Sequence, residues 1–217
     1  MDPTRLILAR HGQAHCNVRG ILGGPRGCTG LTDHGHHQAR QLADRLRTDH
    51  AQTPINAAYT TPLRRALETA DIIGHHLGLP VTTADDLREP DYGDADGKAW
   101  PDVVAAFGRI PAQHPDQPIA PGAESWTAYL QRAAATLRDL LARHTGGTVL
   151  IVGHGETVTA AAHLFLDLAA SLRASAAFAV HYASITRWEQ QPLAWTRPEV
   201  GWPWTLLNHN DTAHLTG

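Results

Sequence analysis

The sequence predicts an α/β fold, a three-layer sandwich in which helices cover both faces of a mostly parallel central sheet. Short apolar segments alternate with segments whose apolar residues recur every three or four positions, which is typical of strands alternating with helices. Strands that are joined through helices run parallel to one another. A chain of 217 residues is long enough for one large α/β domain, so we expect a single domain over residues 1–217.

The elements can be placed from apolar runs, caps and breakers. Thr32 is expected to cap the first long helix, Pro62 to lie in the first turn of the next, and Gly146-Gly147 to end the third. The β-branched run 148–152 is the clearest buried strand. The expected elements are, in order, a strand over 4–9, a glycine-rich loop over 19–30, a helix over 32–48, a strand over 55–60, a helix over 62–77, a short strand over 80–83, a helix over 124–144, a strand over 148–152, a helix ending at 168, and edge strands over 178–188 and 202–207.

A proline-rich segment interrupts this pattern in the middle of the chain. Pro101, Pro111, Pro115, Pro118 and Pro121 fall within 22 residues. Proline breaks both helices and central strands. We therefore predict a lid-like insertion over about 90–122, with at most one short helix near 103–107.

Composition excludes several classes of partner. The formal net charge is −3, the isoelectric point is near 6.6, and the 18 Lys and Arg residues form no basic stripe, so nucleic acid is not expected to bind. The N-terminus lacks the features of a signal peptide, and no run reaches the roughly 18 apolar residues of a membrane span. Cys16 and Cys28 are too few for a disulfide framework, and we expect a cytoplasmic location without membrane attachment.

Charged and nucleophilic side chains follow three of the predicted strands. Arg10 and His11 end the first strand, Arg64 or Arg65 follows the second, and His154 follows the strand over 148–152. The carboxyl ends of parallel strands share one edge of the sheet, so these groups are expected to meet. Guanidinium groups match phosphate oxygens, and their charge disfavours protonation of a neighbouring imidazole. Two histidines and two arginines together predict a site for a dianion.

Several segments resemble the histidine phosphatase superfamily, also called phosphoglycerate mutase-like. The similar segments are RHGQAHCN at 10–17, LTDHGHHQA at 31–39, TTPLRRALETA at 60–70, LREPDYGDADG at 87–97, PGAES at 121–125, VGHGE at 152–156, and YASIT with NDTAHL near the end. They occur in the family's order over almost the whole chain. The resemblance implies the phosphoglycerate mutase-like fold and, because PGAES is similar to the PGGES of phosphatase members, the phosphatase branch.

The resemblance also implies roles for individual residues. His11 would be the nucleophile that becomes phosphohistidine, and Glu89 would be the proton donor, with Asp91 and Glu156 as alternatives for that role. Arg10, Arg65 and His154 would hold the phosphoryl oxygens and take part in catalysis. The residues expected to bind substrate are Arg10, Asn17, Gly24, Arg65, His154, Gly155 and Glu156. The chemistry implied requires neither a metal ion nor a cofactor.

The expected activity is hydrolysis of a small-molecule phosphomonoester. The substrate could be a sugar phosphate, a nucleotide or a biosynthetic intermediate, and a homodimer is possible. A phosphomutase of the same fold is an alternative, although Arg109 stands alone where mutases of the family carry an adjacent arginine pair. A catalytically idle binding domain is a second alternative.

Other motifs are weaker. His34, His36 and His37 could suggest a metal, but adjacent helix positions point in different directions, so we expect a solvated helix face. Asp94 and Asp96 resemble parts of calcium and aspartyl-phosphatase motifs but lack the remaining residues of either.

Overall fold

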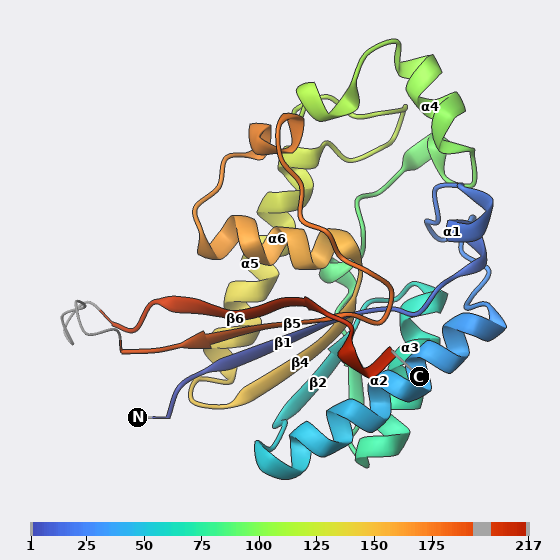
Figure 1. The fold of residues 1–217 in the computed structure, drawn as a ribbon. Coiled ribbons are helices and arrows are strands. Elements are labelled where there is room, and N and C mark those ends of the chain that lie inside the picture. The colour runs from blue at the N-terminus through green and yellow to red at the C-terminus, as the bar shows by residue number, and fades with distance from the viewer. Residues whose placement is uncertain (1, 193–200, 216–217) are drawn as a thin grey trace.

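A computed structural model describes residues 2–192 and 201–215, and its centre is a six-stranded sheet (Figure 1). The strand order is β3-β2-β4-β1-β5-β6. The first four strands in this order are parallel, whereas β5 is antiparallel to β1 and β6 to β5. The strands are β1 (Arg5–Arg10), β2 (Ala57–Thr60), β3 (Val81–Thr83), β4 (Thr148–Gly153), β5 (Ile185–Gln190) and β6 (Trp204–Asp211).

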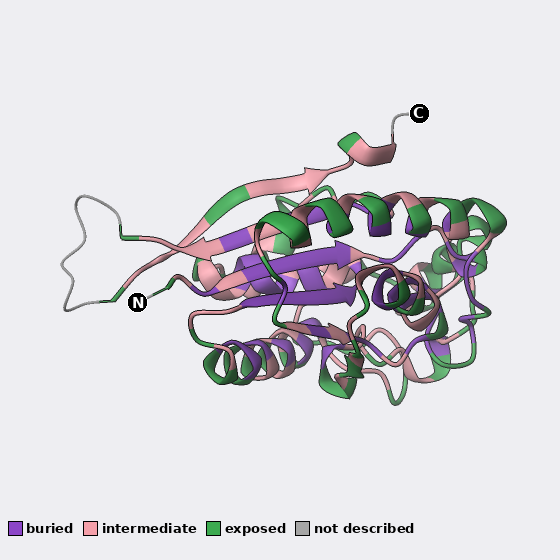
Figure 2. Ribbon diagram, turned by 90° about the horizontal axis from the view of Figure 1, so that it is seen from below, coloured by how far each residue is buried: buried purple, intermediate pink, exposed green. Residues whose placement is uncertain are grey.

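Helices cover both faces of this sheet, which confirms the predicted α/β sandwich. Alternate residues of β1 point to opposite faces: Ile7 and Ala9 pack with α2 and α3, while Leu6 and Leu8 pack with α5 and α6. Figure 2 shows the buried strands between the two helical layers. The helices are α1 (His15–Arg19), α2 (Asp33–Gln52), α3 (Arg64–Leu77), α4 (Trp100–Phe107), α5 (Trp126–Arg143) and α6 (Gly155–Phe165).

The predicted helices are present, with different ends. The Thr32 hydroxyl accepts a hydrogen bond from the Gly35 amide at 3.0 Å and caps α2, which continues four residues beyond the predicted end at residue 48. Helix α3 begins only at Arg64, so the placement of Pro62 inside its first turn was wrong. Helix α1 was not predicted, because five residues are too few to show a helical period.

The predicted strand over 178–188 was wrong in its first half. Strand β5 begins at Ile185, and it is an inner strand between β1 and β6 rather than an edge strand. Ala183 has a left-handed backbone with φ of 55°, which an extended strand cannot contain. The preceding residues instead pass over Arg10, whose guanidinium donates to the Val180 carbonyl.

The predicted insertion contains α4 and two short 3₁₀ turns, at 93–95 and 111–113. A third 3₁₀ turn, at 85–87, lies just before the insertion. Figure 1 shows the α4 segment standing away from the sheet, above α1. None of the described helices is both long enough and apolar enough to span a bilayer.

Candidate active site

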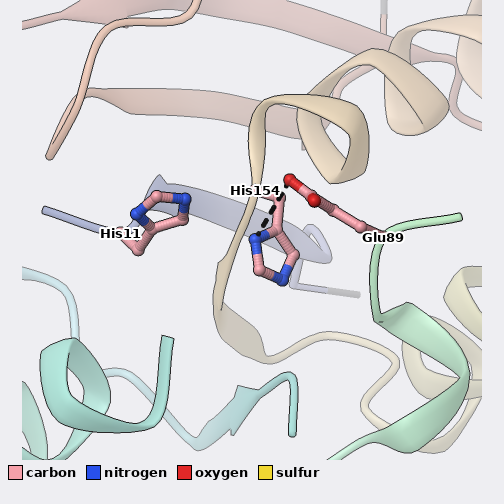
Figure 3. A group of neighbouring side chains, drawn as sticks. All are labelled: His11, Glu89 and His154. Carbon is pink, nitrogen blue, oxygen red and sulfur yellow. Dashed lines mark ion pairs between the residues drawn. The ribbon is translucent and has the colours of Figure 1, made fainter. Parts of the chain in front are cut away.

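The sheet places His11 and His154 next to each other. Arg10 at the end of β1 pairs with Gly153 at the end of β4, and the His11 amide donates to the Gly153 carbonyl at 2.9 Å. Each histidine is therefore the first residue after its strand. Their ring centroids lie 5.3 Å apart, with the planes at 65° (Figure 3).

The hydrogen bonds of His11 show which ring nitrogen carries no proton. Nδ1 lies 2.6 Å from the Gly12 carbonyl, which can only accept, so Nδ1 carries the proton. Arg65 Nε donates to Nε2 at 3.0 Å. Burial lowers the pKa of His11 well below 6.5, and the neighbouring charges of Arg65 and Arg10 lower it further. His11 is therefore a neutral imidazole whose Nε2 is the potential nucleophile.

Arg65 contacts both His11 and Glu89 within the cluster formed by Arg10, His11, Arg65, Glu89 and His154. It lies in the first turn of α3 and is 1% exposed. Its Nη1 donates to the Gly23 carbonyl, and its Nη2 lies 2.7 Å from Glu89 Oε2. Arg64 instead forms an exposed ion pair with Glu68 at 2.7 Å. The structure thus places Arg65, and not Arg64, beside His11.

A threonine orients His154. The Oγ1 of Thr61 lies 2.7 Å from His154 Nε2, while His154 Nδ1 faces Glu89 Oε1 at 3.5 Å. A proton on Nδ1 suits the neighbouring carboxylate, and Nε2 then accepts from the threonine hydroxyl. Burial first, then Arg65 and Arg10, lowers the pKa of His154 well below 6.5, so this ring is also neutral.

The Glu89 carboxylate contacts both Arg65 and His154. Figure 3 shows its contact with His154. The Tyr92 hydroxyl donates a hydrogen bond to Glu89 Oε2 at 2.8 Å. Burial alone would raise the pKa of Glu89, but the charge of Arg65 and the Tyr92 hydrogen bond outweigh it and lower that pKa below 4.5. Glu89 is thus ionised in the free protein.

Two buried hydrogen-bond donors of the cluster have no acceptor. The Arg10 guanidinium lies 4.2 Å from the centre of the Tyr182 ring. Within the part of the chain that the structure describes, Arg10 Nε and His154 Nδ1 are buried without a hydrogen-bond partner. Buried donors are normally satisfied. An anion held by these two residues would supply the missing acceptors.

The role of the other residues expected to bind substrate stays a prediction. Asn17 Oδ1 accepts from the Ala14 amide at 3.2 Å, at the start of α1. Gly24 packs against Asp96, because a Cβ there would fall 2.7 Å from the carboxyl carbon. Gly155 and Glu156 line a cavity together with Arg10.

The two alternatives to Glu89 differ in their surroundings. Asp91 is exposed and its carboxylate accepts from the Gly93 amide at 2.9 Å, within a turn. Glu156 lies at the start of α6, where burial, followed by the charge of Glu89, raises its pKa to about 7. Glu156 therefore exchanges its proton near neutral pH, and Asp91 serves the local turn.

The cluster has the donor set of a metal site but the charges of an anion site. His11, Glu89 and His154 each offer a ligand atom within 4.8 Å of the others. However, Arg65 donates to two of these residues, and a divalent cation would have to displace its guanidinium. This arrangement favours an anion over a cation.

The other motifs have structural explanations. The Asp96 carboxylate accepts from the amides of Arg26 and Gly27 at 2.8 and 3.0 Å, so it holds the glycine-rich loop. His34 and His37 are exposed on α2, as expected for a solvated face.

Sequence reasoning missed five residues that shape the site. Tyr92 and Thr61 stand inside the similar segments, but only their contacts with Glu89 and His154 reveal them. The missed residues are Gly23, Thr61, Tyr92, Arg173 and Tyr182.

Known proteins are similar to this chain over most of its length. It is 34% identical over 163 residues to putative phosphoserine phosphatase 2 of Hydrogenobacter thermophilus, covering 72% of this chain and 75% of that protein. It is 32% identical over 169 residues to the 2,3-bisphosphoglycerate-dependent phosphoglycerate mutase of Brucella canis, covering 71% and 78%. The structure of Bacillus stearothermophilus YhfR matches with a TM-score of 0.79 and 27% identity, over 98% of this chain and 99% of that one.

Some relatives are longer: the chain spans 45% of a bifunctional protein of Mycobacterium tuberculosis to which it is 33% identical. A model of the histidine phosphatase superfamily, branch 1, matches residues 6–201. This match over nearly the whole chain, together with the likeness of its fold to YhfR, shows that the chain belongs to the histidine phosphatase superfamily, whose fold is called phosphoglycerate mutase-like.

Proposed function

We propose that this protein is a metal-independent phosphatase that hydrolyses a small-molecule phosphomonoester through a phosphohistidine intermediate on His11. The observation that carries the proposal is the state of His11: a buried neutral imidazole whose Nε2 lone pair faces a guanidinium. The loose transition state of phosphoryl transfer spreads negative charge over the equatorial oxygens. Fixed cations and hydrogen-bond donors around His11 would stabilise that charge.

Binding of the substrate changes the partners of Arg65. In the free protein Arg65 Nε donates a hydrogen bond to His11 Nε2, and Arg65 Nη2 forms an ion pair with Glu89. A phosphate dianion accepts these donors in place of Glu89 and His11, and Arg10 Nε and His154 Nδ1 donate to it as well. Glu89 then loses the charge that lowered its pKa and faces a negative phosphate, so its pKa rises. Substrate binding thereby converts Glu89 from a carboxylate into an acid.

The reaction proceeds in two displacements. In the first, His11 Nε2 bonds to phosphorus, the bond from phosphorus to the alcohol oxygen breaks, and Glu89 gives that oxygen its proton. In the second, Glu89 takes a proton from water as the water oxygen bonds to phosphorus. The nitrogen–phosphorus bond breaks, its electron pair returns to Nε2, and inorganic phosphate leaves.

A phosphomutase is the second candidate, because the Brucella relative carries that name. A mutase must hold a second anionic group beside the transferred phosphoryl group. Arg109, the arginine of the insertion, is exposed and does not line the cavities next to the site. Apart from Arg10 of the site itself, the arginine that lines them is Arg173, which shares that space with the carboxyl group of Glu156. A carboxyl group in this space would repel a second phosphate, which favours hydrolysis over a mutase reaction.

Turnover of nitrophenyl phosphate in excess chelator tests the proposal. We expect the wild type to release phosphate at an unchanged rate when chelator is added. His11→Ala should abolish both turnover and the phosphoenzyme trapped by acid quenching, whereas His37→Ala, on the exposed face of α2, should retain both. A His11→Ala protein with a near wild-type rate, or a wild type silenced by the chelator, would refute the mechanism. A mutase or a domain that only binds phosphate would show little turnover.

A further inference from the structure

A cavity opens beside the proposed proton donor. It has a volume of about 240 Å³ and lies between the insertion, Trp126 at the start of α5, and Glu156 at the start of α6. Tyr92, whose hydroxyl binds Glu89 at 2.8 Å, forms part of its wall. An alcohol that leaves phosphorus next to Glu89 therefore has this cavity at its side.

A second cavity extends this space toward the phosphate-binding residues. Its volume is about 260 Å³ and its lining includes Arg10 and Gly155. The two cavities share three residues: Trp126, Glu156 and Arg173. Together they form a cleft that runs from Arg10 to the insertion.

The wall contributed by the insertion contains three large apolar side chains as well as the polar His114 and Gln117. Trp100 is 40% exposed, although large apolar side chains are normally buried, and it lines the cavity together with Pro111 and Ile119. Across the cavity, Trp126 belongs to a separate buried cluster with Tyr129. Trp100 thus offers apolar surface to a ligand rather than to the core.

Two ionisable side chains also line this space, Arg173 and Glu156. The Arg173 guanidinium lies 4.3 Å from the centre of the Trp126 ring, and Glu156 is the carboxylic acid next to it. Within the described residues, neither Arg173 nor Glu156 has an ion-pair partner within 4.0 Å. They are available for polar substituents of a ligand, while Trp100, Pro111 and Ile119 offer it apolar surface.

We propose that the alcohol released by this phosphatase carries an aromatic or similarly flat apolar ring, which packs against Trp100 in the cavity of about 240 Å³ while the phosphate is held at His11. This inference rests on the proposed function and names the substrate class of the same site. An apolar cavity of about 150 Å³ is large enough for a benzene ring. Burying such a ring removes apolar surface from water, which a short open-chain alcohol cannot do to the same extent.

Matched alkyl phosphates test this substrate class. Propyl phosphate and 3-phenylpropyl phosphate both release a primary alcohol of nearly equal basicity, so the ratio of their kcat/KM values reports the contribution of the ring. We expect the wild type to prefer the phenylpropyl ester by about tenfold or more. Trp100→Ala should reduce this ratio at least about threefold. Leu166→Ala, which removes an exposed leucine that lines neither cavity, should leave the ratio unchanged.

Binding of the corresponding phosphonates separates this inference from the proposed function, because a phosphonate is not hydrolysed. Calorimetry should show tighter binding of 3-phenylpropyl phosphonate than of propyl phosphonate to the wild type, and a smaller difference in Trp100→Ala. If the binding difference is found but neither ester is hydrolysed, the ring-binding cavity is supported and the phosphatase activity is refuted. Equal affinities for the two phosphonates, or a difference that Trp100→Ala leaves intact, would overturn the inference.

Discussion

Thr61→Val is expected to impair catalysis more than its effect on stability would suggest. Thr61 is fully buried and its Oγ1 lies 2.7 Å from His154 Nε2. Valine has nearly the same shape but no hydroxyl, so Nε2 loses its donor and the ring loses the preference for a proton on Nδ1. Leaving a buried polar group without a partner costs about 1–3 kcal/mol. If all of this loss falls on the transition state, kcat/KM decreases by about 5- to 150-fold.

The neighbouring Thr60 provides a matched control. It is also buried, but its hydroxyl contacts only backbone carbonyls, those of Val152 at 3.2 Å and Thr61 at 3.5 Å, and no side chain of the site. Thr60→Val and Thr61→Val should therefore lower the free energy of unfolding by similar amounts, about 1–3 kcal/mol in urea titrations. Only Thr61→Val should show the large decrease in kcat/KM.

Two further measurements distinguish positioning of His154 from a general loss of structure. Thr61→Ser keeps the hydroxyl and should restore most of the activity. Nitrogen NMR shifts of the His154 ring should show the Nδ1–H form in the wild type and a mixture of tautomers in Thr61→Val. Equal decreases in kcat/KM for Thr60→Val and Thr61→Val, or no rescue by serine, would show that Thr61 does not act through His154.

Two other predictions concern carboxyl groups. Glu89→Gln should reduce turnover much more for propyl phosphate than for nitrophenyl phosphate, because a good leaving group needs little protonation; equal losses in steady-state assays would move the acid role to Glu156. Glu156→Gln should become more stable relative to the wild type as pH rises from 5 to 8. In the folded wild type, the Glu156 carboxyl group has its pKa raised to about 7 and keeps a proton that the unfolded chain releases near 4.5. The folded wild type therefore binds more protons than its unfolded state and loses stability as pH rises, whereas glutamine does not titrate. Urea titrations at several pH values check this, and a constant difference between the two proteins would show that the Glu156 carboxyl group titrates normally.

Local sequence patterns determined the elements that carry the site. The apolar runs before Arg10 and His154 identified two parallel strands, and parallel strands end at a common edge whatever the side chains beyond them. Thr32 at a helix start and Gly146-Gly147 at a helix end also act through neighbouring residues only. These features were correct because each depends on backbone geometry within a few positions of the sequence.

Features that depend on distant contacts could not be read in this way. Residues 178–184 alternate like a strand, but their path over Arg10 and the left-handed Ala183 end the strand early. The sequence alone left Arg64 and Arg65 equivalent, and the resemblance chose between them. Only the structure shows how Arg65 is held, by the Gly23 carbonyl and the Glu89 carboxylate.

The sequence by itself thus determined that the central sheet is mostly parallel and that His11 and His154 follow two of its parallel strands. Tertiary structure alone decided which ring nitrogen of His11 is unprotonated, that Arg65 holds Glu89 ionised in the free protein, and that Trp100 faces a cavity. The physical reason is that protonation and side-chain orientation are set by partners within a few ångströms. Such partners are brought together by packing and not by proximity along the chain.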